Sequence, residues 1–262
     1  MTQKGTYYFI GINGVGMSGL ASMLVQRGDQ VLGSDISNTM DINMFKGMGI
    51  QAFNTHDSLR IKPDMTVVYS SAITDDNEEL SAARKQQCKI MKRGALLATL
   101  SKEFPTQISV AGTHGKTTTS AMLTKIYQEA GLNPSYFIGG YLNREEHGKI
   151  NSKDIIITEL DESDGTFLHI QPNSAIITNL ELEHHNYFKS KQHLVSDFLI
   201  FINNIIENNG KCMLNIDDSS LKKIYKQSNK PTSFITFGIE SEACNISAKN
   251  IEYNWQGALF SL

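Results

Sequence analysis

The stretch from Ile108 to Tyr127 constrains the fold most, because a glycine-bracketed loop there joins an apolar segment to a helical pattern. The loop reads Gly-Thr-His-Gly-Lys-Thr-Thr over residues 112–118. A strand, a glycine loop and a helix N-terminus in this order present backbone N–H groups and the positive end of the helix dipole to an anion. Lys116 can reach the terminal phosphates of a nucleoside triphosphate, and the Thr117 hydroxyl can ligate magnesium. The sequence therefore predicts a triphosphate-binding loop.

This loop differs from a strict P-loop. A P-loop has a glycine six residues before its lysine, and this chain has Val110 at that position. We interpret the stretch as a compact variant with its glycines at Gly112 and Gly115. The alternative is an ordinary strand–turn–helix junction that binds nothing. We favour the variant because Lys-Thr-Thr stands where a strand pattern gives way to a helix pattern, a combination that rarely arises by chance.

A second glycine loop lies near the N-terminus, between a strand pattern at residues 7–10 and a helix pattern at residues 17–27. Gly11 and Gly16 bracket it, and Asn13 replaces the middle glycine of G-x-G-x-x-G. The next strand pattern ends on Asp35, 19 residues after Gly16. This spacing is typical of a nucleotide-binding βαβ unit. A tight turn of a doubly wound sheet without a ligand is the alternative.

Further polar residues follow predicted strands. Ser70 and Ser71 end a strand pattern that starts at residue 65. Open α/β sheets bind ligands at the carboxyl ends of their strands, although two such serines also make good helix caps. In the second half of the chain, strand patterns at residues 154–159 and 174–179 end in the acidic clusters 159–164 and 181–185.

These acidic clusters can converge on the triphosphate loop if their strands neighbour it. A triphosphate with Mg²⁺ needs oxygen ligands near its terminal phosphate. Glu159 or Glu162 can ligate a metal, and His184 or His185 can ligate a second metal or orient a phosphate. Helix capping is the alternative for each carboxylate taken singly.

Composition excludes several classes of protein. Charged residues make up 19% of the 262 residues, the net charge is −3 and the pI is about 6.2, so nothing attracts the chain to nucleic acid or an anionic membrane. Three widely spaced cysteines fit neither a disulfide framework nor a zinc site. We find no signal peptide and no membrane-spanning run, and we expect a cytoplasmic protein.

The chain is long enough for two domains, and Phe104-Pro105 is the best boundary. We predict an α/β fold with a Rossmann-like domain over residues 1–104 and a P-loop domain over residues 105–262. An apolar stripe from Leu194 to Ile205 at helical spacing predicts a core-facing helix. Alternation over residues 246–253 and 258–260 predicts a hairpin.

Five motifs in order resemble those of the Mur ligase family, and the resemblance covers essentially the whole chain. They are Gly-Ile-Asn-Gly-Val-Gly-Met-Ser-Gly (11–19), Tyr-Ser-Ser-Ala-Ile (69–73), Ala-Gly-Thr-His-Gly-Lys-Thr-Thr-Thr (111–119), Glu-Leu-Asp-Glu-Ser-Asp (159–164) and Thr-Asn-Leu-Glu-Leu-Glu-His (178–184).

The resemblance implies an ATP-dependent acid–amino-acid ligase of peptidoglycan biosynthesis, and hence a role in cell-wall biogenesis, cell shape and cell division. Its substrates would be UDP-N-acetylmuramate and L-alanine, and its cofactors ATP and Mg²⁺. The muramyl carboxylate would become an acyl phosphate that the alanine amine attacks. The family fold has a Rossmann-like domain, a P-loop central domain with a parallel sheet and a small antiparallel sheet, and a third domain that we expect to be absent here.

The resemblance also implies roles for individual residues. The expected catalytic residues are Lys116, Glu159 and His184. The expected metal ligands are Thr117, Glu159 and His184. The expected ATP contacts are Gly112, Thr113, His114, Gly115, Lys116, Thr117 and Thr118. The expected UDP-sugar contacts are Gly11, Asn13, Gly14, Val15, Gly16, Met17, Asp35, Ser70 and Ser71.

The chain departs from the family pattern in two places. Asn13 stands where the family usually has glycine, and Glu183-His184-His185-Asn186 replaces the usual Asp-His-Met-Asp. Without the third domain, we expect the chain to bind UDP-N-acetylmuramate, to bind ATP weakly and to ligate poorly or not at all. A homo-oligomer or a partner that supplies the missing domain stays open.

Three other functions compete with this one. The first is a murein peptide recycling ligase that uses the same nucleotide sugar, which the Gly-Met-Ser-Gly ending at residues 16–19 disfavours. The second is a catalytically inactive fragment that binds UDP-sugar and ATP. The third is an NAD-linked Rossmann oxidoreductase, which has no use for the loop at residues 112–118.

Overall fold

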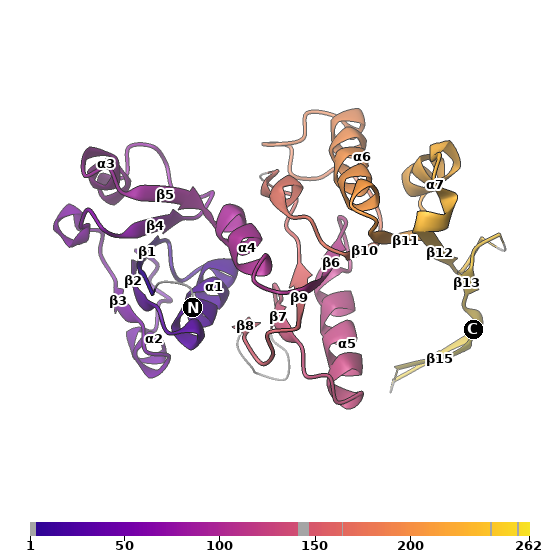
Figure 1. Cartoon of the computed structure of the whole chain (residues 1–262), viewed down its shortest axis with the longest axis horizontal. Coiled ribbons are helices and arrows are strands. Elements are labelled where there is room, and N and C mark those ends of the chain that lie inside the picture. Colours follow the sequence, from indigo (N-terminus) through magenta and orange to yellow (C-terminus); the bar gives the residue numbers. More distant parts are fainter. Residues whose placement is uncertain (1–3, 141–146, 164, 242, 256) are drawn as a thin grey trace. The chain divides into compact units, whose positions relative to one another are not determined.

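The computed structural model describes residues 4–140, 147–163, 165–241, 243–255 and 257–262. The chain folds into two compact units (Figure 1). Unit 1 comprises residues 1–105 and 120–159, and unit 2 comprises residues 106–119 and 160–262. No helix within these described ranges is both long and apolar enough to cross a bilayer.

Unit 1 begins with a five-stranded parallel sheet in the order β3-β2-β1-β4-β5. Its strands are β1 (Thr6–Ile10), β2 (Gln30–Ser34), β3 (Gln51–Phe53), β4 (Thr66–Tyr69) and β5 (Lys89–Lys92). The helices between them are α1 (Val15–Arg27), α2 (Ile42–Gly47) and α3 (Glu78–Lys85), and η1 (Ser58–Arg60) is a 3₁₀ turn. Helix α4 (Arg93–Ser101) follows β5. The strand order reverses beside β1, which is where open α/β sheets bind ligands.

The helices of this sheet begin and end at residues that favour such boundaries. The side chains of Asp41 and Asn77 cap α2 and α3 by accepting two backbone N–H bonds each. Helix α1 ends at Gly28, whose φ of 95° a residue with a side chain rarely adopts.

A buried polar cluster centres on Glu79, which is fully buried. Its Oε1 accepts hydrogen bonds from the Tyr8 hydroxyl at 2.6 Å and the Asp57 backbone N–H at 3.0 Å. Its Oε2 accepts from the Ser34 hydroxyl and lies 2.7 Å from His56 Nδ1. Burial, followed by the contact with Glu79, raises the pKa of Tyr8 above its ordinary value. Both carboxylate oxygens therefore have partners. We interpret Glu79 as a structural residue that connects β1, β2 and α3, and not as part of a ligand site.

Apart from a C-terminal pair, the other strands are parallel in unit 2, in the order β13-β12-β11-β10-β6, and follow the order β9-β7-β8 in unit 1. Strands β7 (Ser135–Phe137), β8 (Gly148–Lys149) and β9 (Ile155–Glu159) fall in unit 1. Strands β6 (Thr106–Ala111), β10 (Ser174–Ile177), β11 (Lys211–Asn215), β12 (Phe234–Gly238) and β13 (Ile246–Ser247) fall in unit 2. The remaining helical elements are α5 (Lys116–Glu129), η2 (Thr166–His169), α6 (Lys191–Glu207), α7 (Ser219–Gln227) and η3 (Pro231–Ser233).

Helices α6 and α7 both pack against β11 in unit 2 (Figure 1). The predicted apolar stripe is confirmed, since each of Leu194, Phe198, Phe201, Ile202 and Ile205 is at most 1% exposed. The Phe167 ring lies 5.0 Å from that of Phe198 and 5.4 Å from that of Phe201. Each such side chain contributes roughly 2 kcal/mol by leaving water, so this stripe anchors α6 to its sheet.

The first strand of the C-terminal hairpin starts later in the sequence than the alternation from residue 246 predicts. The hairpin consists of β14 (Lys249–Asn254) and β15 (Gly257–Ser261), which pair antiparallel. Ile246 and Ser247 instead pair in parallel with β12, because Asn245 accepts from and donates to Thr236 and so holds this segment at the sheet edge. Gln256, in the predicted turn, lies outside the described residues. The α/β fold with a parallel sheet and a small antiparallel sheet is confirmed.

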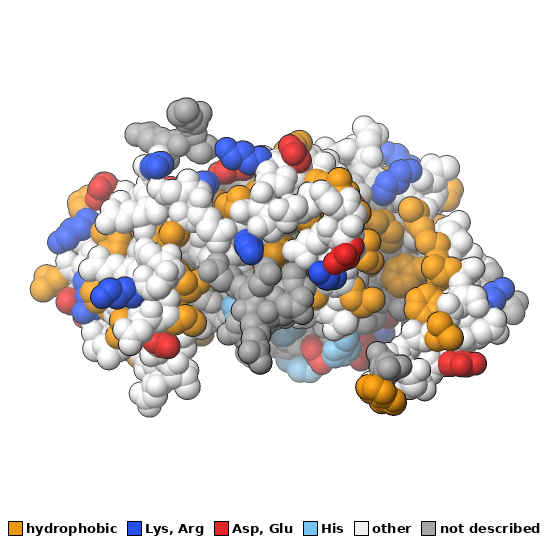
Figure 2. All heavy atoms as spheres, turned by 90° about the horizontal axis from the view of Figure 1, so that it is seen from below, with side chains coloured by type: hydrophobic (Ala, Val, Ile, Leu, Met, Phe, Trp, Pro, Cys, Tyr) orange, Lys and Arg blue, Asp and Glu red, His pale blue; other side chains and the backbone are white. Residues whose placement is uncertain are grey.

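Hydrophobic side chains of the hairpin face solvent. Figure 2 shows such side chains at the right-hand end of the view, where Figure 1 places β13 and β15. Trp255 is 92% exposed and Tyr253 is 77% exposed. An isolated two-stranded hairpin gains little stability from burial.

Candidate nucleotide site

The triphosphate loop lies between the end of β6 at Ala111 and the start of α5 at Lys116. Gly112 and Gly115 have φ values of 124° and 79°. A Cβ on Gly112 would overlap Thr178 Oγ1 and would lie 2.9 Å from the carbonyl oxygen of Asn179. At Gly115 no atom lies within 4 Å of that position. At position 112 both the backbone angle and close packing therefore exclude a side chain. At position 115 the backbone angle alone disfavours one.

The segment that follows β10 holds the loop in place. Asn179 accepts the Thr113 N–H on its carbonyl oxygen at 3.0 Å and the His114 N–H on its side chain at 2.9 Å. The Thr113 hydroxyl donates to the Glu181 carbonyl at 3.0 Å and accepts the Glu181 N–H at 2.9 Å. Because these contacts use the N–H groups of Thr113 and His114, an anion must be bound chiefly by the first turn of α5.

The Lys116 side chain folds back over the loop. Its ammonium group donates to the carbonyl oxygens of Gly112 at 2.6 Å and Thr113 at 3.0 Å. It also donates to Glu162 Oε1 at 3.1 Å and lies 3.0 Å from Oε2. The Glu162 side chain is 2% exposed. Burial raises the pKa of Glu162 above its ordinary value, and the Lys116 charge opposes that rise.

Two histidines lie close to carboxylates around the loop. His184 has a left-handed backbone, with a φ of 50°, and its Nε2 lies 3.6 Å from Glu162 Oε1. His114 Nε2 lies 3.5 Å from Glu181 Oε2 and 3.7 Å from Glu183 Oε1. Unit 2 thus gathers Lys116, Glu162 and His184 at one point beside the loop.

The expected metal ligands are divided between the units. Thr117 and His184 belong to unit 2, whereas Glu159 ends β9 in unit 1, where its Oε2 accepts the Gly139 N–H at 2.6 Å. Across the described ranges, no group of three or more His, Cys, Asp and Glu side chains is arranged to hold a metal. Asp164 lies outside those ranges.

The residues present nonetheless fit a magnesium ion bound with a triphosphate. The buried Oε2 atom of Glu162 accepts no hydrogen bond from the described residues, although it forms an ion pair with Lys116 at 3.0 Å. Carboxylate oxygens are the donors that Mg²⁺ prefers. The Thr117 hydroxyl adds a second oxygen donor near the loop.

The glycine loop of unit 1 is tied to the end of β2. The N–H groups of Gly11 and Ile12 donate to the Ser34 carbonyl at 2.8 and 3.0 Å. The Asn13 N–H donates to Asp35 Oδ2 at 3.0 Å, and its side-chain amide donates to Thr39 at 3.3 Å. The structure therefore brings Asp35 to the loop and gives Asn13 a role in the turn.

The other expected contacts of this loop differ in exposure. A Cβ on Gly11, whose φ is 85°, would lie 3.0 Å from Ser70 Oγ, so this hydroxyl borders the loop. Gly14 precedes α1 as its N-cap, and Val15 is exposed. Met17 is 1% exposed, which makes its side chain part of the core. Ser71 is exposed one residue beyond Ser70.

Arg93 was not among the predicted site residues. It is the first residue of α4 and directly follows β5. A Cβ on Gly16 would overlap its guanidinium group, so this cation lies against the glycine loop. A basic residue at the carboxyl end of a strand in the same sheet is the signal that could have found it.

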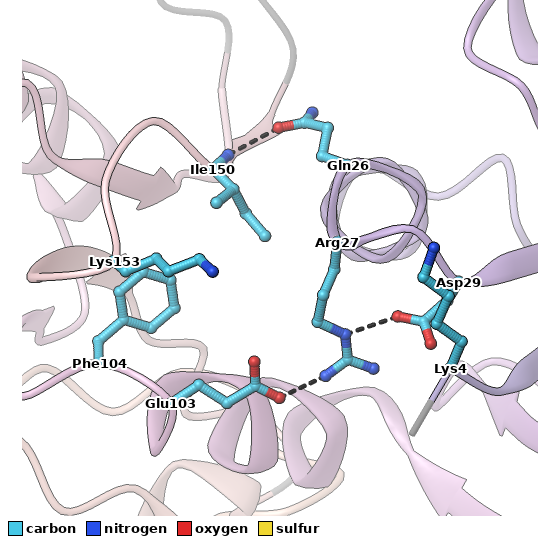
Figure 3. Close-up of a pocket in the computed structure, with 8 residues that line it drawn as sticks. All are labelled: Lys4, Gln26, Arg27, Asp29, Glu103, Phe104, Ile150 and Lys153. Carbon is cyan, nitrogen blue, oxygen red and sulfur yellow. Dashed lines mark hydrogen bonds and ion pairs between the residues drawn. The ribbon is translucent and has the colours of Figure 1, made fainter. Parts of the chain in front are cut away.

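A cavity of about 380 Å³ lies at the other end of α1 (Figure 3). Arg27 lines it, donating to Asp29 Oδ2 at 2.6 Å and to the Tyr7 hydroxyl at 3.1 Å and forming an ion pair with Glu103. The Ile150 N–H donates to Gln26 Oε1 at 2.7 Å. Three of the five guanidinium N–H groups are therefore donated to side chains of the same unit, and we regard these walls of the cavity as structural.

Comparison with known proteins identifies the family. Residues 6–105 match the Mur ligase family catalytic domain, and residues 110–262 match the Mur ligase middle domain. The chain belongs to the Mur ligase family.

The chain is similar to curated UDP-N-acetylmuramate–L-alanine ligases. It is 38% identical to that of Aquifex aeolicus over 246 residues, which cover 94% of this chain and 53% of the relative. It is 37% identical to that of a Hydrogenobaculum species, covering 98% of this chain and 56% of the relative. The chain thus spans about half the length of the curated relatives it matches.

Solved structures agree on the fold. UDP-N-acetylmuramate–alanine ligase from Thermotoga maritima superposes with a TM-score of 0.81 at 27% identity, covering 94% of this chain and 55% of that chain. A UDP-N-acetylmuramate:L-alanyl-γ-D-glutamyl-meso-diaminopimelate ligase from Neisseria meningitides gives a TM-score of 0.83 at 23% identity, covering 98% of this chain and 85% of that chain. At that lower identity the likeness concerns the fold alone.

Proposed function

We propose that this chain provides the UDP-sugar-binding and ATP-binding parts of an enzyme that joins L-alanine to UDP-N-acetylmuramate in peptidoglycan biosynthesis. One observation carries the proposal most directly: the loop at residues 112–118 has two glycines with positive φ, a helix N-terminus and a lysine in one place. Identities of 37–38% to ligases of that name support the choice of substrates. The reaction would take place in the cytoplasm.

The two halves of the chain have separate tasks in this proposal. Residues 1–104 bind the UDP-sugar and residues 105–262 bind ATP, a division supported by family matches over residues 6–105 and 110–262. The glycine loop from Gly11 to Met17 would cradle the diphosphate, with Asp35 fixing the loop and Ser70 and Ser71 at its edge. Arg93 adds a positive charge where that diphosphate would lie.

The proposed reaction has two steps. A muramyl carboxylate oxygen attacks the γ-phosphorus of ATP, ADP leaves, and an acyl phosphate forms. The alanine amine then attacks the acyl carbon, loses a proton and expels inorganic phosphate. Lys116 would stabilise charge on the transferred phosphoryl group, together with the N–H groups that begin α5.

A magnesium ion would neutralise phosphate charge when bound with ATP. Thr117, His184 and one of the carboxylates of Glu159 and Glu162 are the residues that we assign to hold it or the phosphate it contacts. Within the loop from Gly112 to Thr118, the remaining ATP contacts would come chiefly from the N–H groups that begin α5, because those of Thr113 and His114 are donated to Asn179. The His114 side chain lies near Glu181 and Glu183.

Calorimetric titration of the purified chain with UDP-N-acetylmuramate, ATP–Mg²⁺ and NADH tests the proposal. We expect UDP-N-acetylmuramate to bind, ATP–Mg²⁺ to bind more weakly and NADH not to bind. Tight NADH binding without UDP-sugar binding would overturn the assignment in favour of an oxidoreductase. Alanine-dependent phosphate release by this chain alone would overturn the expectation that it ligates poorly.

A further inference from the structure

The ammonium group of Lys116 has all three of its hydrogens engaged. Two are donated to the carbonyl oxygens of Gly112 and Thr113, and the third to the Glu162 carboxylate. An ammonium has three donors. A phosphate oxygen can therefore hydrogen-bond this group only by displacing one of the three present acceptors.

Glu162 is the acceptor that conflicts with a phosphate. The two carbonyl oxygens are neutral and belong to the loop, whereas the carboxylate carries a charge of the same sign as the phosphate. Its side chain is 2% exposed, so water screens that repulsion only weakly. The turn around it is fixed, because Gly165 N–H donates to the Glu162 carbonyl at 3.2 Å and Ser163 N–H donates to Asp161 at 2.9 Å.

We propose that Glu162 is a positioning residue that competes with nucleotide phosphate for Lys116 and thereby sets the affinity of the loop. The inference rests on the proposed function, since it assumes that residues 112–118 bind a nucleotide. Without phosphate, the ion pair with Glu162 holds the Lys116 ammonium beside the loop carbonyls. When phosphate binds, a Lys116–phosphate contact replaces the Lys116–Glu162 ion pair.

His184 is placed to receive the carboxylate when the exchange occurs. Its Nε2 lies 3.6 Å from Glu162 Oε1, about half an ångström beyond a normal hydrogen bond. A small approach would replace the lost lysine contact with an imidazole N–H. The exchange therefore need not leave a buried carboxylate without a partner, which would otherwise oppose phosphate binding.

Substitution of Glu162 tests the competition directly. Glu162→Gln keeps the size of the side chain and removes its charge, so we expect metal-free ATP and ADP, titrated in EDTA, to bind on the order of tenfold more tightly. A merely structural role for Glu162 predicts weaker or unchanged binding. Omitting the metal separates this effect from any contact between Glu162 and a cation.

Two further variants locate the effect. In a Lys116→Met background the Glu162→Gln substitution should no longer tighten ATP binding, because the competed group is gone. Glu207→Gln is the charge control: it removes one negative charge from an exposed side chain at the end of α6, outside the proposed site, and we expect a change of about twofold or less. Thermal unfolding of each variant confirms that it is folded.

The outcomes separate this inference from the proposed function. If wild type binds ATP and Glu162→Gln binds it no more tightly, the competition is wrong and the nucleotide assignment stands. Equal tightening with and without Lys116 also overturns the competition. If neither wild type nor Glu162→Gln binds ATP, both fail. Should Glu162→Gln not fold, Glu162→Asp, which keeps the charge but withdraws it from Lys116, should still tighten binding.

Discussion

The carboxylate of Asp35 accepts a hydrogen bond of 3.0 Å from the backbone N–H of Asn13, which ties the glycine loop of unit 1 to the end of β2. Its other oxygen accepts the Ser37 N–H at 2.8 Å. Both oxygens are thus occupied by backbone donors. Asp35 therefore shapes the loop, whatever it also contributes to a ligand.

Asp35→Ala should weaken UDP-N-acetylmuramate binding because the loop loses this support. We expect the free energy of unfolding to fall by about 1–2 kcal/mol, the usual cost of orphaning such donors. Calorimetric titration and chemical denaturation measure the two effects. Asp41→Ala is the control, since it removes two N–H contacts at the start of α2 and should cost about 1 kcal/mol without altering affinity.

The two glycines of the triphosphate loop should respond differently to alanine. Gly112→Ala introduces a Cβ that overlaps Thr178, and we expect it to abolish ATP binding and to destabilise the fold by about 3 kcal/mol. Gly115→Ala meets no atom within 4 Å, so only backbone strain of about 1–2 kcal/mol remains. Denaturation curves and ATP titration of both variants check this. Equal losses would contradict the packing account of Gly112.

Arg93→Met should weaken UDP-N-acetylmuramate binding while leaving the fold intact. A charge-assisted hydrogen bond contributes about 1.5–3 kcal/mol, so the dissociation constant should rise roughly 10-fold to 100-fold. Titration at two salt concentrations measures it, and the loss should be smaller at high salt. Arg84→Met, which removes an exposed ion pair with Asp75, is the control. An unchanged affinity for the Arg93 variant would remove that residue from the site.

Asp217 should make unit 2 sensitive to acid. Partial burial raises the pKa of this carboxyl, but hydrogen bonds from the N–H groups of Ile239, Glu240 and Ser241 outweigh it and hold the pKa below its ordinary value. A depressed folded-state pKa gives stability that is present above the unfolded-state pKa and is lost as pH falls through the folded-state value.

Asp217→Asn should therefore unfold with a shallower dependence on pH below about pH 4. Chemical denaturation of wild type and variant between pH 3 and pH 7 measures the slope. If the free energy of unfolding depends on pH equally in wild type and variant, Asp217 does not cause the acid sensitivity.

Much of the fold follows from local signals in the sequence. The strands that carry Ile10, Val68 and Val110 are apolar runs closed by glycine or hydroxyl residues, and the stripe on α6 has a clear helical period. The short elements α2 and β3 escaped prediction because they are 6 and 3 residues long, too short for a period to be read. Ile246 was assigned to the hairpin because its alternation continues into β14, and only the contact between Asn245 and Thr236 separates them.

The candidate site was less predictable than the fold. Glycine loops and strand ends in the sequence suggested Gly112, Asp35 and Glu159 as candidates, because such patterns depend on short segments. The contact of Arg93 with Gly16 and the pairing of Lys116 with Glu162 join residues 77 and 46 positions apart. A strand-end pattern can suggest these residues, but which of them touch depends on the packing of whole elements.

Trp255 is the chain's one tryptophan, and it lies on the solvent-exposed hairpin at 92% exposure. Its fluorescence already reflects water in the folded protein, so its emission would shift little when either hydrophobic core unfolds. Circular dichroism is the better probe for the denaturation experiments above. Conversely, a blue shift of that emission would report whatever molecule covers the hairpin, without any label having to be introduced.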